Sequence, residues 1–572
     1  MTISRREMII VMGATAATAL VGRPFANAAP KPAAAMPRIP LEEFLQTDSL
    51  VAALRKGVRA MKKRKPSDPL SWFYQAAIHG VTPEDITEAA KIDPDVEEVS
   101  PEKWNQCPHD GEHSADFLPW HRGYTYYFEK ILRMHTEDDN FSLPYWNYDE
   151  IENRAFPKAF GIKHLDGDPN NEADENINPL HHESRDFYLA TYEHWSNPNF
   201  KPLVELSRFA VDTTIPMNAP VFFGATEQEG LAGGIYDSDP STRGLLESYP
   251  HDQIHRAVGG IVITPDGKDH AGAMATPPTA GFDPVFCIHH TNIDRLWARW
   301  SCMPGKDWGV LPPKAWFEER PWTFFDIDRT EVNEPRKKYF DYRALGIRFK
   351  DEDLSCTPLQ LPDWIKAEGE VSLNAPPVSA LAMKARSTQI LTSKVIELTA
   401  PSIGKSVVTV SKPAKEVLRK RVGSFKAKLT SNSEILSAPI EEKRIFLRLR
   451  NLELESLQGT GFDVHVTDNP QGPVSRSDVS FVGSIKLFNH PPGHRHNLSA
   501  SRSRGRASRT PMQESNSQTF DVTKALAATK SENLAGLSVV LVPYSLVSSA
   551  NREVVSLGTN AMKVGNIEFF VR

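Results

Sequence analysis

Long apolar runs are almost absent from this chain of 572 residues. The one notable run, residues 8–21, lies near the N-terminus and is short and rich in alanine and threonine. No other segment approaches the roughly 20 apolar residues that a membrane-spanning helix needs. We therefore expect the mature protein to be soluble, with no part that enters a membrane.

Cysteine and excess charge are also scarce. A chain of this length does not need a disulfide scaffold, and it holds only 4 cysteines, at positions 107, 287, 302 and 356. One bridge is compatible with export, but their spacing does not show which pair forms it. The net charge of −6 gives no general attraction to nucleic acid or anionic membranes, so we expect no nucleic-acid partner.

The N-terminus has the features of an export signal. Arg5 and Arg6 precede the apolar run, and the sequence ANA at 26–28 has the small-residue spacing of a cleavage site. Paired arginines are typical of the twin-arginine route. We predict a twin-arginine signal peptide at residues 1–28 and a periplasmic or secreted protein. The alternative is an N-terminal membrane anchor, for which the run is short.

The length predicts two to four domains, and the sequence pattern changes once along the chain. The clearest helices are residues 117–134 and 284–300, and the second has a proline in its first turn. Later segments alternate apolar and polar residues with period two, which is typical of a β-sandwich. These segments are 395–398, 407–410, 445–454, 462–466, 539–542 and 567–571. We predict a mainly α domain (a helical bundle) at 29–365, a linker at 366–390 and an all-β, sandwich-like domain at 391–572.

One cluster of histidines has spacing that suits a metal site. His251 and His255 are four residues apart, so on a helix they project from one face. The pair His289-His290 follows about 35 residues later in the sequence. Three imidazoles from such a set leave coordination positions open for a small ligand. This pattern suits zinc as well as copper.

A second cluster lies earlier in the chain. It consists of His79, His109, His113 and His121. No carboxylate or thiolate repeats beside these histidines in the pattern of a zinc site. Ligation by imidazole alone suits copper, which binds such sites strongly. Two sites of this kind on adjacent helices would let both metal ions contact one dioxygen molecule.

Several motifs around these histidines resemble the tyrosinase and polyphenol oxidase family of type 3 copper proteins. They cover most of residues 70–300 in the family's order, and their combination is highly specific. The motifs are WNQC followed by His109 at 104–109, FLPWHR at 117–122, LPYWNY at 143–148, PHDQIH at 250–255 and the block 283–297. FDVHV at 462–466 and FVGS at 481–484 are similar to the β-domain that follows the oxidase core in plant-type polyphenol oxidases.

The resemblance implies a ligand set and supporting residues. The first copper would be held by His79, His109 and His121, and the second by His251, His255 and His290, with His289 in a supporting position. Glu247 matches the acidic residue that holds a water near the coppers. Cys107 stands where related proteins form a thioether with a ligand histidine, and the alternative is an unmodified thiol.

One spacing departs from the family pattern. The family usually places the second and third ligands of the first copper nine residues apart, whereas His109 precedes His121 by twelve and His113 precedes it by eight. His109 is favoured because the motif before it is intact. His113 is its rival.

The resemblance also implies a reaction. Two copper ions would bind dioxygen as a bridging peroxide and oxidise o-diphenols, with monophenols as further candidate substrates, to o-quinones. Glu247 would act as general base. Asp252 would help to deprotonate a monophenol, or tether a water or a ligand histidine. The alternatives are a reversible oxygen carrier, and a zinc hydrolase, for which no glutamate stands inside the unit His251–His255.

The C-terminal part has two interpretations. In related latent enzymes a similar domain covers the copper site until a protease removes it. The linker, the basic stretch 415–426 and the arginine-rich loop 501–509 are candidate cleavage sites for such an activating protease. The alternative is a permanently attached, stabilising domain.

Tyr342 resembles a tyrosine that closes the family's catalytic domain, and we expect Arg38 to be its partner.

Overall fold

The structure is a computed structural model of the chain. It describes residues 36–108, 115–185, 204–224, 230–233, 243–263, 269–366, 389–401, 405–411, 415–416, 418–419, 422, 444–454, 460–485, 518–530, 534, 536–549 and 561–571. The predicted signal peptide and most of the predicted linker lie outside these residues. Among the described helices, none combines the length and apolar character needed to span a bilayer.

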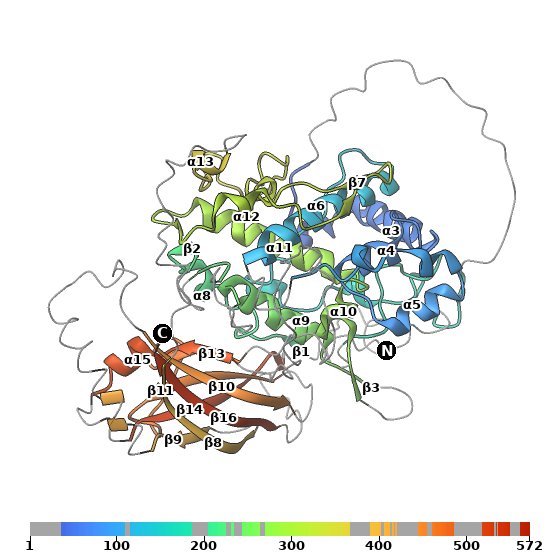
Figure 1. The fold of residues 1–572 in the computed structure, drawn as a ribbon. Coiled ribbons are helices and arrows are strands. Elements are labelled where there is room, and N and C mark those ends of the chain that lie inside the picture. Colours follow the sequence, from blue (N-terminus) through green and yellow to red (C-terminus); the bar gives the residue numbers. More distant parts are fainter. Residues whose placement is uncertain are drawn as a thin grey trace, which may run out of the picture.

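The N-terminal part is mainly helical, and long helices surround its centre (Figure 1). Its principal helices are α3 (Asp48–Lys62), α4 (Trp72–His79), α6 (Phe117–Thr136), α9 (Asp252–Gly259) and α11 (Val285–Cys302). Shorter helices are α2 (Leu41–Phe44), α5 (Pro83–Ala90), α7 (Lys158–Gly161), α8 (Thr214–Met217), α10 (Pro277–Ala280), α12 (Lys314–Glu318) and α13 (Asp363–Lys366). Short strands between them are β1 (Val204–Leu206), β2 (Val221–Phe223), β3 (Ile261–Ile263), β4 (Asp269–Ala271), β5 (Asp307–Gly309), β6 (Phe324–Phe325) and β7 (Glu331–Val332).

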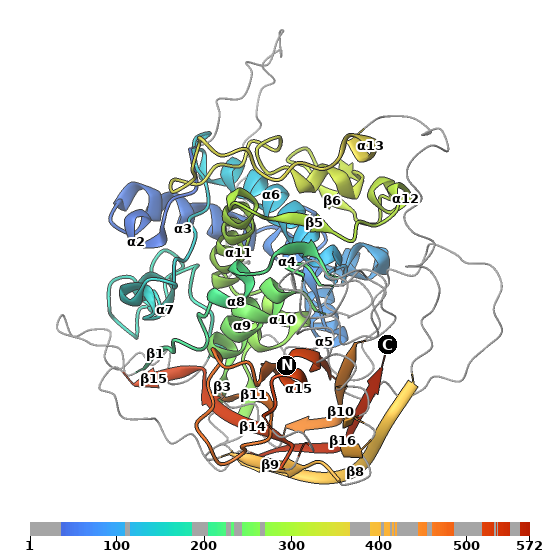
Figure 2. The ribbon, with the colours of Figure 1, turned by 90° about the vertical axis from the view of Figure 1, so that its left-hand side faces the viewer.

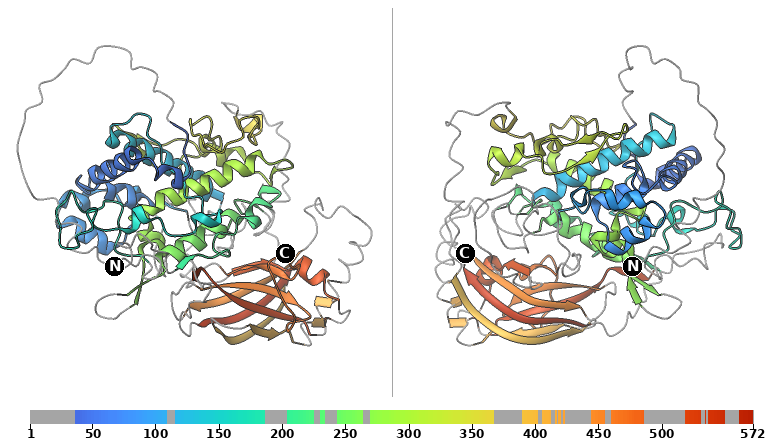
Figure 3. Two further views of the ribbon diagram at one scale, coloured as in Figure 1. Left: turned by 180° about the vertical axis from the view of Figure 1, so that it is seen from behind. Right: turned by 45° about the vertical axis from the view of Figure 1, so that its right-hand side comes forward.

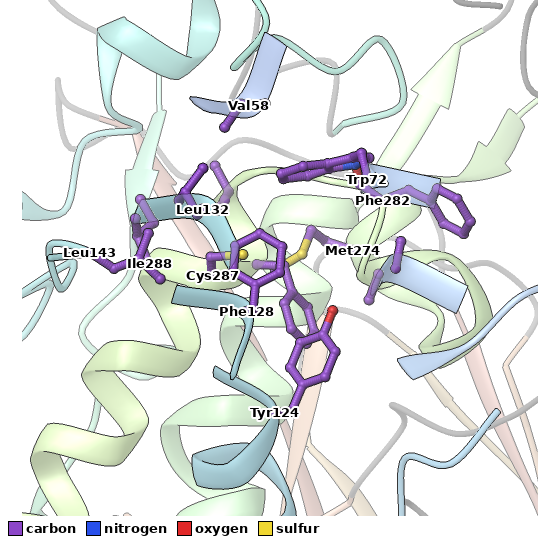
Figure 4. Close-up of a cluster of buried hydrophobic side chains, with 14 of the residues drawn as sticks. Val58, Trp72, Tyr124, Phe128, Leu132, Leu143, Met274, Phe282, Cys287 and Ile288 are labelled. Carbon is purple, nitrogen blue, oxygen red and sulfur yellow. The ribbon is translucent and has the colours of Figure 1, made fainter. Parts of the chain in front are cut away.

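The two predicted helices form with nearly the expected bounds, and both are buried. Along α11 every residue from Val285 to Ala298 is buried. The Asp283 carboxylate accepts a hydrogen bond from the backbone N–H of Val285, which satisfies one of the free donors at the helix start. Such a helix must be enclosed by others. Figure 4 shows apolar side chains of α3, α4 and α6, among them Val58, Trp72 and Phe128, gathered around Cys287 of α11.

The end of α11 is tied to the rest of the domain by a disulfide. Cys302 and Cys356 form this bridge, with their Cα atoms 5.7 Å apart. Cys107 and Cys287 are buried and form no disulfide. The sequence left the pairing open, because residues 54 positions apart meet only through the tertiary fold.

In its described residues the C-terminal part forms two four-stranded antiparallel sheets, which lie below the helical domain in Figures 1, 2 and 3. One sheet has the order β13-β10-β16-β8 and the other β12-β11-β14-β9. The bounds are β8 (Gln389–Pro401), β9 (Ser406–Thr409), β10 (Ile445–Leu454), β11 (Thr460–Thr467), β12 (Phe481–Ser484), β13 (Gln518–Asp521), α15 (Thr523–Ala527), β14 (Ser538–Ser545), β15 (Val547–Ser549) and β16 (Ala561–Val571).

Period-two alternation accounts for the shared core of the two sheets. In β10 the side chains of Ile445, Leu447 and Leu449 are buried, and they belong to one hydrophobic cluster with Val464 of β11 and Leu541 of β14. The intervening residues Phe446 and Arg448 point to the other face of the strand, where Phe446 stacks on Phe570 of β16. The sequence prediction of a helical domain followed by a β-domain is therefore confirmed.

A buried ion network joins the start of the described chain to α6 and α11. Arg38 donates to Glu129 and to Asp294, at 2.9 Å each, and Arg122 donates to the second oxygen of Asp294 at 2.6 Å. The expected pairing of Arg38 with Tyr342 is wrong. Arg122 lies over that ring instead, 5.5 Å from its centroid, because the two carboxylates hold Arg38 elsewhere.

Asp294→Asn should destabilise the helical domain strongly. The change leaves two buried arginines facing one carboxylate fewer, and breaking a buried pair typically costs about 3–5 kcal/mol. Thermal unfolding followed by circular dichroism measures the loss. Glu334→Gln is the control, because Glu334 and Lys338 form an exposed pair 2.8 Å apart whose loss should cost about 0–1 kcal/mol. Equal melting temperatures for the two variants would contradict this role of the network.

Candidate metal centre

The fold brings histidines from four separate segments into two buried groups that can hold metal ions. The groups are His79, Cys107 and His121, and His251, His255, His289 and His290. Within each group the candidate ligand atoms all lie within 4.8 Å of one another. α4 and α6 supply the histidines of the first group. α9 with the residue before it, and the second turn of α11, supply those of the second.

The second group has the geometry of ligands around one ion. His251 precedes the first residue of α9 and His255 lies within it, and their ring centroids are 4.5 Å apart. The Nε2 atoms of His255 and His290 are 3.2 Å apart. Two nitrogens at this separation can both bind a metal at the usual distance of about 2.0–2.1 Å.

The two groups are direct neighbours. The rings of His121 and His290 stack with centroids 4.2 Å apart and an interplanar angle of 8°. His121 and His251 have centroids 6.0 Å apart. Metal ions in the two groups would therefore lie close enough to share one small ligand.

Backbone carbonyls orient three of these histidines. The Nδ1 atoms of His79, His121 and His255 donate to the carbonyl oxygens of Pro277, Phe117 and Met274, at 2.9, 2.8 and 2.9 Å. A carbonyl oxygen only accepts, so the ring proton is on Nδ1 and the lone pair is on Nε2. Each ring therefore presents Nε2 as its ligand atom.

Burial keeps these imidazoles neutral, which is the form that binds metal. It lowers the pKa of His121 and of His255 to about 3. Burial also lowers the pKa of His251, His289 and His290 well below the ordinary value. Few protons compete with a metal ion at neutral pH.

His289 differs from the others in its Nδ1 partner. This atom lies 3.1 Å from the hydroxyl oxygen of Tyr148. A hydroxyl, unlike a carbonyl, can donate to Nδ1, which then places the ring proton on Nε2 and removes that atom as a ligand. This contact supports His290 rather than His289 as a ligand.

Two carboxylates and an arginine lie beside the second group. Asp252 accepts from Nδ1 of His251 at 2.9 Å, and Arg243 donates to the other oxygen of Asp252 at 2.9 Å. Nε of Arg243 is 3.6 Å from Glu247. Sequence reasoning found Glu247 and Asp252 but missed Arg243. Its only sequence signal is that it stands four residues before Glu247, one helical turn away.

The first group includes a cysteine. Sγ of Cys107 lies 3.3 Å from Nε2 of His121, and the backbone N–H of Cys107 donates to the carbonyl of His79 at 3.4 Å. His109 and His113 both lie outside the described residues, so the choice between them stays a prediction.

Comparisons with known proteins point to one family. Residues 69–303 match the common central domain of tyrosinase. A tyrosinase of Hahella sp. (strain CCB-MM4) is 27% identical over 461 residues, which cover 77% of this chain and 83% of that protein. The chloroplastic (+)-larreatricin hydroxylase of Larrea tridentata is 27% identical over 464 residues, covering 80% and 68%.

Solved structures share the fold across both domains. A latent aurone synthase (polyphenol oxidase) aligns over 96% of this chain and 93% of its own, with a TM-score of 0.51 and 20% identity. A latent apple tyrosinase aligns over 94% and 98%, with a TM-score of 0.50 and 19% identity. At this identity the likeness concerns the fold alone.

His290→Ala should lower the metal content from two ions per chain to one, whereas His289→Ala should retain both. The reason is that only His290 is expected to present a lone pair to the ion. Metal analysis of the purified variants checks this, with Tyr148→Phe as the milder control that should also retain both ions. The reverse pattern for the two histidines would reassign the ligand.

Proposed function

Because the chain belongs to the tyrosinase and polyphenol oxidase family, we propose that it is a copper-dependent oxidase that converts o-diphenols to o-quinones with dioxygen. The observation that carries this is the pair of adjacent, buried histidine groups. Each quinone formed releases two electrons and two protons, so one dioxygen oxidises two diphenols and becomes two water molecules.

The donor set fits two copper ions. It contains neutral imidazoles oriented by fixed carbonyls, with no carboxylate among the candidate ligands of either group. Imidazole suits copper, and among the divalent first-row metals copper generally binds such sites most tightly. When bound, the copper pair supplies the binding and reduction of dioxygen. The protein excludes bulk water from it, since His79, His251 and His255 are fully buried.

We propose His79, His109 and His121 as ligands of the first copper and His251, His255 and His290 as those of the second. Glu247 is the proposed base that takes the proton from the phenol oxygen, directly or through a held water. It is buried and begins the turn that leads to His251. Cys107 is proposed to form a thioether with His109, supported by the position of its sulfur inside the first group.

The activity test measures dioxygen consumption and quinone formation together. With catechol we expect two quinones for each dioxygen, and we expect His255→Ala to fall to the background rate because it removes a ligand. Stripping the metal should abolish turnover, and copper but not zinc should restore it. Dioxygen uptake without quinone would favour a carrier, and zinc in place of copper in the purified chain, with neither dioxygen uptake nor quinone formation, would favour a hydrolase. Either result would overturn the proposal.

The third ligand of the first copper is tested separately. His109→Ala should leave one copper per chain, because it removes a ligand, while His113→Ala should keep two. Copper analysis of the two variants decides the question. If His113→Ala loses a copper and His109→Ala does not, the ligand is His113.

We also propose the domain limits and the destination of the chain. The catalytic domain is placed at 29–365, the linker at 366–390 and a β-sandwich at 391–572; support comes from α13, which ends at Lys366, and from β8, which begins at Gln389. We propose export through the twin-arginine route, with a signal peptide at 1–28, to the periplasm or beyond. The Cys302–Cys356 bridge supports this, since disulfides persist in oxidising compartments.

A second proposal concerns the C-terminal domain, which we infer acts as a removable lid. Its strands contact the segment that carries His251 and His255 at three positions. The N–H of Ser484 donates to the Tyr249 hydroxyl oxygen at 2.6 Å, and Arg256 donates to the carbonyl of Thr460 at 2.5 Å. The hydroxyl of Tyr544 donates to the side-chain oxygen of Gln253 at 3.1 Å. The helix of the second copper is therefore packed against this domain.

Arg476 is the charged centre of this interface. It donates to both oxygens of Asp463, at 2.9 and 3.0 Å, within its own domain. It also lies 3.3 Å from Asp212 of the helical domain, and its guanidinium is 5.6 Å from the ring centroid of Tyr249. Only 9% of this side chain is exposed, so its removal would leave the buried Asp463 and the partly buried Asp212 without this counter-charge.

Arg476→Ala should raise the diphenol oxidation rate of the uncut protein several-fold, toward the rate reached after limited trypsin treatment. The reason is that the loss of a buried charge pair, about 3–5 kcal/mol, loosens the lid. The matched control is Arg450→Ala, because Arg450 pairs with Glu568 inside one sheet at 3.0 Å. If trypsin never raises the rate and Arg476→Ala behaves as the control does, the domain is a permanent stabiliser.

A further inference from the structure

Arg243 places a buried guanidinium between the two carboxylates beside the second histidine group. Only 4% of Arg243 is exposed, and Asp252 and Glu247 are 0% and 1% exposed. Nη1 of Arg243 donates to Asp252 at 2.9 Å, and Nε lies 3.6 Å from Glu247. All three groups are buried, and Arg243 contacts both carboxylates, so these contacts help to set their mutual orientation.

The two oxygens of Asp252 have different partners. Oδ2 accepts from Arg243, and Oδ1 accepts from Nδ1 of His251 at 2.9 Å. The carboxylate therefore lies between the arginine and the ligand ring. Because both oxygens are engaged, Arg243 determines where Oδ1 meets the imidazole.

The ring of His251 is oriented by a side chain, whereas the rings of His79 and His255 are oriented by backbone carbonyls. Nδ1 of His79 and Nδ1 of His255 each donate to a carbonyl oxygen at 2.9 Å, and backbone is fixed by the fold. For His251 the carbonyl of Glu247 is farther away, at 3.2 Å, and the shorter contact is the one to Asp252. A side-chain carboxylate can rotate, so it needs a second contact to hold it.

Charge gives Arg243 a second effect. A buried carboxylate without a counter-charge is strongly disfavoured, and a guanidinium in direct contact compensates it. A carboxylate held against Nδ1–H fixes the tautomer of a ligand histidine and strengthens its donation to the metal. Removing such an outer partner typically lowers metal affinity about 10- to 100-fold.

We propose that Arg243 is a positioning residue for the second copper, which acts through Asp252 to hold His251 in its ligating orientation. This inference rests on the proposed function, since it presupposes that the second group binds copper. It assigns Asp252 to the support of a ligand rather than to the deprotonation of a monophenol.

The test measures how firmly each copper is held. Wild type and variants are loaded with copper and dialysed against increasing concentrations of EDTA, and copper per chain is measured at each step. Arg243→Gln should release one of its two coppers at about 10- to 100-fold lower EDTA than wild type, with the other retained as in wild type. Arg243→Lys, which keeps the charge, should recover part of this difference.

Two further variants separate positioning from general loss of stability. Arg336→Gln removes a comparable buried arginine, which pairs with Asp116 at 2.7 Å and contacts none of the second group's histidines in the described part of the chain. It should lower the melting temperature while both coppers are released as in wild type. In an Asp252→Asn background, Arg243→Gln should have no additional effect, because the path through Asp252 is already broken.

Three outcomes would overturn the inference. They are copper release by Arg243→Gln at the wild-type EDTA concentration, loss of both coppers together, and a full effect of Arg243→Gln in the Asp252→Asn background. Failure of the wild type itself to take up two coppers would instead overturn the proposed function.

Discussion

The hydrogen bonds from Nδ1 of buried histidines to fixed acceptors are the interactions on which the rest of the structure depends. The acceptors for His79 and His255, the carbonyls of Pro277 and Met274, lie in segments remote from the histidines in sequence. The orientation of these rings therefore depends on the tertiary fold of the helical domain. Once it is folded, burial keeps the rings neutral and the bonds direct Nε2 toward the metal positions.

The same reasoning explains why charged residues surround the site without entering the ligand set. Asp294 holds Arg38 and Arg122 together, and so fixes α6 against α11 close to His121 and His290. Removing one partner from such a buried network is strongly destabilising, although the network itself adds little net stability. The C-terminal domain adds contacts to the outside of α9, so both domains bear on the position of His251 and His255.

The features that the sequence predicts are those with a local signal. The sequence indicated α6 and α11, the latter by a proline in its first turn, within about two residues of their observed ends, an error that is ordinary for helix boundaries. Period-two alternation indicated the strands of the C-terminal sheets, such as β10. The spacing of His251 and His255 placed both on one helix face, and the structure brings them beside His290.

Features that depend on long-range packing had no such signal. Arg243 has no motif of its own, and its contact with Asp252 is seen only in the folded structure. The pairing of Cys302 with Cys356 and the ion pair of Arg38 with Asp294 join segments that are far apart in the sequence. The spacing around His109 departs from the family pattern, and for that reason motif matching alone left two candidates there.

The central claim is that the two histidine groups together hold a coupled pair of copper ions. The most direct measurement is the copper content of the purified chain together with its near-ultraviolet spectrum after addition of hydrogen peroxide. The account predicts two coppers per chain and a new charge-transfer band that neither group alone would give. One copper per chain, or zinc with no such band, would contradict it.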